Sequence, residues 1–330
     1  MRVCVLPAVK RIELEDRPIP DVPDDFVLVK VSVCGICGSD LAAWQDSGLK
    51  KYPYTPGHEF CGVIEQVGGR ISRLALGQRV VINPNLGCDD CRFCRMGRPN
   101  LCDHLKSRPI KSNGGLADYV AVDHRMARPL PDGVPDALAT YVEPLSCALH
   151  IVRAAGVQPG SRIAVFGAGA LGSLVGLALQ PYDAEVLFIE PQEQRRARLA
   201  RFLGLRVISP DELAGAGLAG HVDAAIECSG NARAVSQAVE ILRKAGRLVL
   251  GGLITHSQQA DVSFAAITVK ELAIRGAWLN PNTFEAAMDL VSASQEALAR
   301  LPTETFPLAR ILPAFERAAS PDAPKVLVTP

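Results

Sequence analysis

The stretch Ser161-Arg-Ile-Ala-Val-Phe-Gly-Ala-Gly-Ala-Leu-Gly172 decides the fold of this chain. Its first half, residues 161–166, is an apolar run typical of a buried strand, and its glycines follow in the spacing G-x-G-x-x-G. A helical stretch continues to about Gln180, and a second strand-like run ends at Glu190. Strand, glycine turn, helix and a strand that ends in an acidic residue are the elements of a dinucleotide-binding βαβ unit.

Each position of the glycine turn has an expected task. Gly167 permits the tight turn, and Gly169 lets the backbone approach a pyrophosphate at the positive end of the following helix. That helix is predicted to begin with Ala170, Leu171 and Gly172, which complete the predicted cofactor-binding turn. The structural alternative is a glycine turn that only allows close packing. The acidic residue at the end of the second strand favours the cofactor.

The residues beyond the turn predict which cofactor binds. Glu190 can accept hydrogen bonds from both hydroxyls of the adenosine ribose, and its charge would repel a 2′-phosphate, so NAD is favoured over NADP. Arg195 and Arg196 follow closely and are long enough to reach a phosphate, which keeps NADP open. Cys228 and Gly251 end later strands, where ligands bind in such sheets, and are predicted cofactor contacts; close packing is again the alternative.

Strand-like runs alternate with helical stretches from residue 143 to about 280. The runs after the glycine turn are Glu185–Glu190, Val222–Glu227, Arg247–Leu250 and Leu272–Arg275, and helices are expected over 192–203 and 232–244. Such alternation predicts βαβ units and hence an α/β domain with a doubly wound parallel (Rossmann) sheet, residues 143–280.

Residues 1–142 are rich in short strands instead. The runs Phe26–Val33, Gly62–Val67 and Gln78–Ile82 are separated by glycine and proline, which predicts a β-rich, barrel-like antiparallel domain. Residues 281–330 return to short helical pieces and end in Lys325–Val328, a strand that we expect to rejoin this first domain.

The composition excludes several classes of protein. Of the 330 residues, 48% are hydrophobic and 21% are charged, and Lys plus Arg equals Asp plus Glu at 35 each. This neutral balance, with no local basic run, argues against nucleic-acid binding. No secretory signal is visible, and glycines interrupt the longest apolar run, Ile163–Leu179. We therefore predict a soluble, cytoplasmic protein with no membrane partner.

Four of the ten cysteines lie close together in the segment 83–104. They are Cys88, Cys91, Cys94 and Cys102, with the spacing C-x2-C-x2-C-x7-C. Four thiolates form a closed tetrahedral zinc site, which is structural because no position stays open for a substrate. An iron–sulfur cluster also takes four cysteines, but this spacing lacks the Cys-Pro ending of the bacterial ferredoxin run. The segment is predicted to be a lobe ordered by structural zinc.

Two stretches nearer the N-terminus supply candidate catalytic residues. Gly35-Ile-Cys-Gly-Ser-Asp40 contains Cys37, and Pro56-Gly-His-Glu-Phe60 contains His58. Alone, a cysteine or a histidine more often packs in a core. Both stretches are followed, in order, by the cysteine lobe, by Gly114-Gly-Leu-Ala-Asp-Tyr119 and by the glycine turn. In that joint order the chain resembles the zinc-dependent medium-chain dehydrogenases over nearly its whole length.

The stretch Val142-Glu-Pro-Leu-Ser-Cys147 narrows the resemblance. Classical alcohol dehydrogenases carry a third cysteine ligand there, whereas the polyol (sorbitol-like) and threonine dehydrogenase branch has Glu-Pro. The resemblance implies a GroES-like barrel for the β-rich domain. It also implies a catalytic zinc held by Cys37, His58 and a glutamate, either Glu59 or Glu143.

The resemblance also implies a route for the substrate proton. Ser39 is placed to take the alcohol proton through its hydroxyl, and Asp40 to orient His58. Some members of the family have a histidine three residues after the relay residue. This chain has Ala42 there, so the route beyond Ser39 stays open.

Together these features imply a zinc-dependent oxidoreductase with two zinc ions per chain, one catalytic and one structural. It would transfer a hydride from a secondary alcohol (a polyol, cyclitol or amino alcohol) to NAD, giving a ketone. A carbonyl reductase that works in the opposite direction and a non-catalytic zinc protein are the alternatives. A homodimer or homotetramer is expected, and Trp44, Tyr52 and Trp278 are candidates for the substrate pocket.

Overall fold

The chain forms two compact units in the computed structural model, which describes residues 1–45, 52–107, 114–252 and 258–330. One unit joins Met1–Pro144 to Asn280–Pro330, and the other is Leu145–Leu279. The boundaries therefore fall at 144/145 and 279/280, beside the 142/143 and 280/281 expected from the sequence. Helix α5 (Val142–Ala155) runs across the first boundary.

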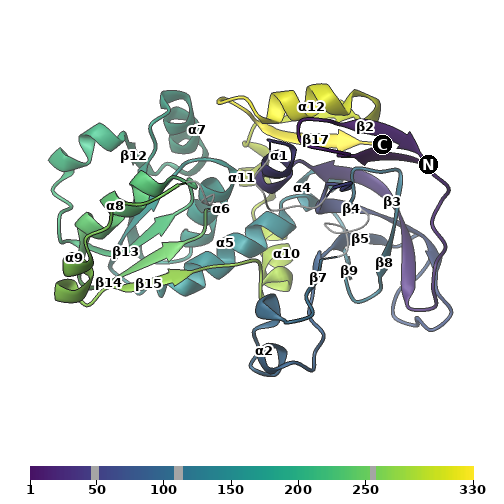
Figure 1. The fold of residues 1–330 in the computed structure, drawn as a ribbon, viewed down its shortest axis with the longest axis horizontal. Coiled ribbons are helices and arrows are strands. Elements are labelled where there is room, and N and C mark those ends of the chain that lie inside the picture. The colour runs from purple at the N-terminus through teal and green to yellow at the C-terminus, as the bar shows by residue number, and fades with distance from the viewer. Residues whose placement is uncertain (46–51, 108–113, 253–257) are drawn as a thin grey trace. The chain divides into compact units, whose positions relative to one another are not determined.

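A six-stranded parallel sheet forms the second unit (Figure 1). Its strand order is β12-β11-β10-β13-β14-β15, and every neighbouring pair is parallel. Counted from β10, this is the doubly wound order 3-2-1-4-5-6 of dinucleotide-binding domains, so the predicted Rossmann sheet is confirmed. The strands are β10 (Ser161–Phe166), β11 (Ala184–Ile189), β12 (Arg206–Ile208), β13 (Val222–Glu227), β14 (Leu242–Leu250) and β15 (Ala273–Gly276).

Helices or short 3-10 turns connect successive strands of this sheet, as crossovers between parallel strands require. The α-helices are α6 (Ala170–Leu179), α7 (Glu193–Leu203), α8 (Ala232–Ile241) and α9 (Phe264–Lys270). The 3-10 turns are η2 (Pro210–Glu212) and η3 (Ala214–Ala216). Apolar side chains of β10, β13 and α8 share one buried cluster, which fixes the sheet against its helices.

The prediction of a helix over 232–244 was wrong at its C-terminal end. Helix α8 ends at Ile241 and β14 begins at once with Leu242. The side chain of Lys270 explains the early end, because its Nζ donates to the carbonyls of Val239, Glu240 and Leu242 at 3.1, 2.9 and 2.9 Å. An ammonium group there satisfies carbonyls that a longer helix would have bonded.

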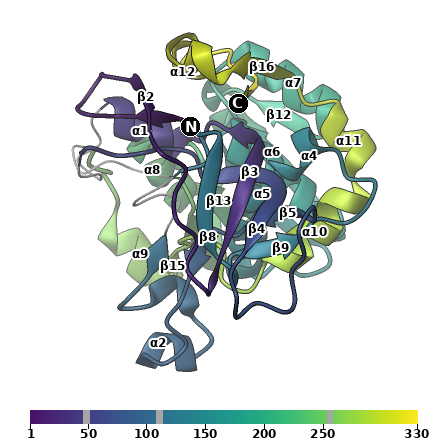
Figure 2. The same cartoon turned by 90° about the vertical axis from the view of Figure 1, so that its right-hand side faces the viewer.

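A seven-stranded sheet dominates the first unit (Figure 2). Its order is β16-β17-β3-β4-β5-β9, with β8 paired to β3, and all pairs are antiparallel except β16 with β17. The predicted β-rich domain is thus confirmed. The strands are β3 (Phe26–Gly35), β4 (Glu59–Val67), β5 (Arg79–Ile82), β8 (Tyr119–Asp123), β9 (Ala127–Pro129), β16 (Thr303–Pro307) and β17 (Lys325–Thr329).

Smaller elements complete the first unit. Two further strand pairs are β1 (Arg2–Val5) with β2 (Glu13–Asp16) and β6 (Asn85–Leu86) with β7 (Lys106–Ser107). The helices are α1 (Gly38–Gln45), α2 (Arg92–Arg95), α4 (Asp136–Ala139), α10 (Phe284–Ala293), α11 (Gln295–Ala299) and α12 (Ile311–Ala318), with 3-10 turns η1 (Pro99–Leu101) and η4 (Leu308–Arg310). Strand β16 lies where only short helices and one strand were expected.

Strand β3 organises the first unit. Its N-terminal half, Phe26–Lys30, pairs with β8, and its last residues, Cys34 and Gly35, pair with β17 on that same edge. Strand β4 runs along its other edge and places Glu59 opposite Gly35. The last strand of the chain therefore lies beside the end of β3, where the first candidate catalytic residues follow.

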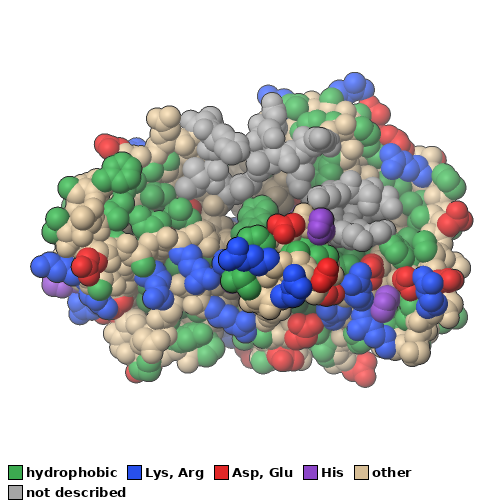
Figure 3. Space-filling model, turned by 60° about the horizontal axis from the view of Figure 1, so that its bottom comes forward, with side chains coloured by type: hydrophobic (Ala, Val, Ile, Leu, Met, Phe, Trp, Pro, Cys, Tyr) green, Lys and Arg blue, Asp and Glu red, His purple; other side chains and the backbone are tan. Residues whose placement is uncertain are grey.

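Side chains of both charges lie at the surface. Acidic and basic side chains occur together on the face shown in Figure 3, in keeping with 35 residues of each sign. Within the described ranges, no helix combines the length and the apolar character that a membrane span needs.

Candidate active site

Asp40 fixes the loop that carries Cys37. Strand β3 ends at Gly35 and helix α1 begins at Gly38, so Cys37 lies in the short turn between them. The carboxylate of Asp40 is fully buried; its Oδ2 accepts the N–H of Cys37 at 3.1 Å, and its Oδ1 accepts the N–H of Gly57 at 3.2 Å. One carboxylate thus joins the two segments that bear the candidate metal ligands.

The same carboxylate lies beside His58. Its Nδ1 lies 3.6 Å from Oδ1 of Asp40, which leaves Nε2 as the nitrogen available to a metal. Burial alone would raise the pKa of Asp40, but the imidazole and the two N–H donors outweigh it and lower that pKa. Asp40 is therefore an anion beside His58; its role in orienting the imidazole stays a prediction.

Cys37, His58 and Glu59 converge. One ligand atom from each lies within 4.8 Å of the others, and thiolate, imidazole and carboxylate are all donors that zinc accepts. Glu143 is buried at the start of α5, yet within the described residues it joins no such group. Ser39 is half-buried in the first turn of α1, and Ala42 follows on the same helix.

Lys325 is the residue of this site that the sequence prediction missed. Its Nζ forms an ion pair with Oε2 of Glu59, and both side chains are buried. Burial by itself would lower the pKa of Lys325, but the carboxylate of Glu59 outweighs it and holds this pKa above the ordinary value. The signal in the sequence is a lysine at the head of an apolar strand, in a segment already expected to rejoin the first domain.

The four cysteines of the lobe form a second group. The sulfur atoms of Cys88, Cys91, Cys94 and Cys102 lie within 4.8 Å of one another. Backbone N–H groups of Cys88 and His104 donate to the sulfur of Cys102, each at 3.3 Å. Backbone hydrogen bonds also lower the pKa of Cys91. Burial instead raises the pKa of Cys94 to about 12. Four sulfurs at this separation are the donor set of a closed zinc site.

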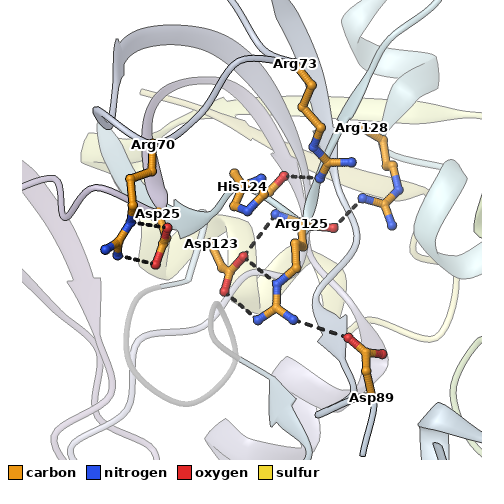
Figure 4. Close-up of polar contacts among 8 residues, drawn as sticks. All are labelled: Asp25, Arg70, Arg73, Asp89, Asp123, His124, Arg125 and Arg128. Atoms are coloured by element: carbon orange, nitrogen blue, oxygen red, sulfur yellow. Dashed lines mark hydrogen bonds and ion pairs between the residues drawn. The ribbon is translucent and has the colours of Figure 1, made fainter. Parts of the chain in front are cut away.

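Arg125 links the lobe to the sheet (Figure 4). Its Nε and Nη2 bind the two carboxylate oxygens of Asp123, at the end of β8, at 3.1 and 3.0 Å. Its Nη1 lies 3.3 Å from Asp89, between the first two cysteines of the lobe. Arg125 thus connects the lobe to the end of β8, although its ion pair with Asp89 is exposed to solvent and contributes little to stability.

The glycine turn of the second unit has the shape that a dinucleotide needs. Gly167 has a φ of +100°, which favours glycine, and a Cβ at Gly172 would lie 2.0 Å from the carbonyl oxygen of Gly167. The backbone of the turn therefore explains glycine at these two positions without a ligand. A Cβ at Gly169 would instead meet no protein atom within 4 Å. Packing cannot explain that glycine, whereas close approach of a pyrophosphate to the first turn of α6, which Ala170 and Leu171 begin, does.

Glu190 lies beside this turn. It is buried, its Oε2 accepts the N–H of Ala168 at 2.8 Å, and its Oε1 accepts the N–H of Gln192 at 2.9 Å. Arg196 donates to the carbonyls of Glu190 and Pro191 at 3.0 and 2.7 Å, and so supports the backbone of the next turn. Arg195 occupies the first turns of α7.

Cys228 and Gly251, the remaining predicted cofactor contacts, lie in different surroundings. The N–H of Cys228 donates to the carbonyl of Phe166 at 2.8 Å, which places Cys228 against the glycine turn. The N–H of Gly251 donates to the carbonyl of Glu227 at 2.9 Å, and a Cβ there would lie 2.5 Å from Ile151. Packing against α5 is therefore sufficient to require glycine at 251.

The three aromatic residues predicted to line the substrate pocket lie in three different environments. Trp44 packs edge-on against Phe315, with ring centroids 5.9 Å apart, in the core of the first unit. Tyr52 donates its hydroxyl to the carbonyl of Ala43. Trp278 belongs to the second unit and is 54% exposed.

Comparison with known proteins identifies the family. Residues 23–132 match the family model of the alcohol dehydrogenase GroES-like domain, and residues 170–293 match that of the zinc-binding dehydrogenases. The chain therefore belongs to the zinc-dependent medium-chain dehydrogenases.

Individual relatives place the chain on the polyol branch of this family. It is 30% identical to D-xylulose reductase A of Aspergillus niger over 345 residues, 98% of this chain and 95% of that protein. Sorbitol dehydrogenase of Bacillus subtilis (strain 168) is 28% identical over 332 residues, 96% and 93% of the two chains. The structure of a protein named as a zinc-binding dehydrogenase, from Sinorhizobium meliloti 1021 and bound to NADP, gives a TM-score of 0.91 at 32% identity, covering 100% and 99%. The predicted zinc-dependent, nicotinamide-dependent dehydrogenase is confirmed. Neither the carbonyl reductase nor the non-catalytic zinc protein is favoured.

Proposed function

We propose that this enzyme oxidises a secondary alcohol group of a polyol to a ketone, with NAD as the hydride acceptor. The convergence of Cys37, His58 and Glu59 within 4.8 Å carries the proposal, because it supplies a metal site beside a buried anionic partner. One relative is named for sorbitol, a polyol, and another for xylulose, a ketose. These names describe the two sides of one reaction type.

Cys37, His58 and Glu59 are the proposed ligands of the catalytic zinc. We choose Glu59 over Glu143 because its carboxylate lies with the other two donors. When bound, zinc lowers the pKa of an alcohol hydroxyl, and NAD accepts the hydride. The proposed task of Ser39 is to accept the alcohol proton at its Oγ, close to Cys37 on the first turn of α1. Ala42 offers no titratable group, so the proton leaves Ser39 by another route.

The glycine turn and Glu190 form the proposed NAD site. Gly169 leaves room for the pyrophosphate, and Glu190 places a carboxylate at the end of β11, where it would accept hydrogen bonds from the adenosine ribose. Arg195, Cys228 and Gly251 are proposed to lie around the cofactor. Cys88, Cys91, Cys94 and Cys102 are the proposed ligands of the structural zinc.

A substrate screen tests the proposed reaction. Purified enzyme is incubated with open-chain polyols, cyclitols, amino alcohols and simple secondary alcohols, each with NAD and with NADP, and the absorbance of reduced nicotinamide is followed. We expect an open-chain polyol with NAD to give the highest kcat/KM. Turnover of simple alcohols alone, or with NADP alone, would contradict the proposal.

The same screen includes Glu190→Gln, which removes the charge and nearly keeps the size of the side chain. Hydrogen bonds to charged groups contribute about 1.5–3 kcal/mol, so the preference for NAD over NADP should fall by about tenfold or more. Arg201→Gln, on an exposed arginine of α7, serves as the matched control and should leave the preference unchanged. An unchanged preference in Glu190→Gln would place cofactor recognition elsewhere.

We also propose that the enzyme is a homodimer. All four residues of β15 are exposed at the edge of the parallel sheet, and neighbouring α9 exposes Phe264 and Val269 at 82% and 73%. Such an edge presents unpaired backbone groups that a second copy can complete about a two-fold axis. Sedimentation should give twice 35.2 kDa, and Ile274→Glu, which adds a charge to this edge, should give 35.2 kDa. A monomeric wild-type enzyme would contradict the dimer, and four copies would favour a homotetramer.

A cytoplasmic location is proposed on the basis of the cysteines. All ten lie in described residues, and none of them forms a disulfide. A four-thiolate zinc lobe requires reduced cysteines, which the cytoplasm maintains and an oxidising compartment does not. Cell fractionation followed by immunoblotting measures the location directly; recovery from a secreted or periplasmic fraction would contradict it.

A further inference from the structure

Three strands meet at the proposed metal site. Lys325 is the first residue of β17, Glu59 is the first residue of β4, and β3 lies between these two strands. The last residue of β3 is Gly35, which pairs with Glu59 on one side and with Leu327 on the other. The ion pair of Lys325 with Glu59 thus passes over the end of the central strand.

Gly35 makes this contact geometrically possible. A Cβ at position 35 would lie 2.5 Å from Oε2 of Glu59 and 2.8 Å from Cε of Lys325. Both are far inside van der Waals contact, so a side chain on the central strand would separate the pair. The strand order and the missing side chain together bring an ammonium group onto a carboxylate that also faces Cys37 and His58.

Burial makes this ion pair energetically important. The side chains of Lys325 and Glu59 are 7% and 2% exposed, and Nζ also lies 5.9 Å from the centre of the Tyr141 ring. Removal of one partner from a buried pair leaves an uncompensated charge, which is strongly unfavourable. Coordination of a metal by Glu59 does not require the lysine. A second cation at the same carboxylate in fact opposes the binding of a metal cation.

We propose that Lys325 competes with the catalytic metal for the carboxylate of Glu59 and so keeps this ligand weakly bound. The inference rests on the proposed zinc site, and Lys325 is a positioning residue because it acts only through Glu59. A weakly held carboxylate suits a site that a substrate has to enter, since one ligand must yield easily while Cys37 and His58 hold the metal.

The direction of the effect follows from comparing the protein with and without metal. Without metal, Lys325 alone compensates the buried carboxylate of Glu59. With metal, two cations share it. Removal of the lysine charge therefore destabilises the metal-free protein more than the metal-bound protein, and it also removes a repulsion between like charges. Both effects strengthen metal binding.

Cobalt binding to the full-length enzyme tests this role. Co²⁺ replaces the catalytic metal while zinc stays in the lobe, and its absorption bands from the thiolate of Cys37 are titrated against dipicolinate as the competing chelator. Loss of a partner that supports a metal ligand typically weakens metal binding by about 10–100-fold. Lys325 differs because it is a cation that opposes the metal, so Lys325→Met should bind Co²⁺ about tenfold more tightly. Lys30→Met, on the exposed face of β3, is the matched control and should bind Co²⁺ as the wild type does.

Two further variants assign the effect to Glu59. In a Glu59→Gln background the lysine has no carboxylate to hold, so Lys325→Met should change the Co²⁺ affinity much less. Lys325→Gln, which removes the charge but keeps an N–H donor on a long side chain, should strengthen binding in the same direction as Lys325→Met. It also keeps the test valid if Lys325→Met does not fold.

The cobalt titrations distinguish failure of the proposed role of Lys325 from failure of the proposed catalytic metal site. If the wild type shows the Cys37 thiolate bands, equal or weaker Co²⁺ binding by both Lys325→Met and Lys325→Gln overturns the role of Lys325 alone. A wild type that takes up metal only in the lobe overturns the proposed catalytic site itself.

Discussion

Cys37→Ala and His58→Ala are each expected to reduce kcat/KM for the best alcohol by about 1000-fold or more. Each substitution removes one of the three proposed donors, so the site loses the metal or holds it in a geometry that no longer activates a hydroxyl. Metal ions contribute several kcal/mol to such reactions, and about 4 kcal/mol corresponds to three orders of magnitude. The absorbance of reduced nicotinamide measures the rate, and thermal unfolding shows that the variants are folded.

Matched controls exist for both residues. Cys147→Ala replaces a half-buried cysteine of α5 that joins no metal-binding group among the described residues, and His221→Ala replaces an exposed histidine. Both should retain activity within about threefold, because neither residue belongs to a proposed metal site and substitutions away from such features usually change little. Turnover within tenfold of the wild type in Cys37→Ala or His58→Ala would refute the proposed mechanism.

Cys91→Ser should act on stability instead of on the chemical step. It breaks the four-sulfur site, and the lobe then has little apolar material to hold it together. A loss of about 3–5 kcal/mol would lower the midpoint of thermal unfolding by roughly 10 °C in a chain of this size. Differential scanning calorimetry measures the shift, and metal analysis should show one zinc fewer per chain.

The comparison with Cys147→Ser distinguishes loss of the zinc site from loss of any cysteine. That variant should unfold within about 2 °C of the wild type, since it leaves both proposed zinc sites intact. Activity per folded molecule of Cys91→Ser should stay within about threefold below its unfolding midpoint, because the lobe sulfurs supply no open metal position. An unchanged midpoint in Cys91→Ser would contradict the structural role of the lobe.

Local patterns were sufficient to predict the nucleotide-binding half of the fold. The run 161–172 combines a buried strand with glycines that act within the turn itself, so the motif is recognisable from neighbouring residues alone. Parallel strands joined by helices also permit few topologies. The end of α8 was not predictable in this way. It depends on Lys270, a side chain that reaches back to the last turn of the helix from the next connection along the chain. Strand β16 was missed because its alternating residues lie among short helical segments.

Local sequence patterns also predicted part of the candidate site. Cys37 and His58 lie in short stretches whose order along the chain is distinctive, so they were found without coordinates. Lys325 was missed, because its partner Glu59 is 266 residues away and only the pairing of β17 with β3 brings the two together. The fold also brings Cys37 to His58 and Glu59, and this convergence favours Glu59 over Glu143.

The zinc content of the purified enzyme tests the assignment of Cys37, His58 and Glu59 most directly. Inductively coupled plasma mass spectrometry, on protein quantified by amino-acid analysis, should give two zinc ions per chain for the wild type. The same measurement should give one for Cys37→Ala, with the lobe zinc retained. One zinc in the wild type, or two in a folded Cys37→Ala, would contradict a catalytic zinc at these residues.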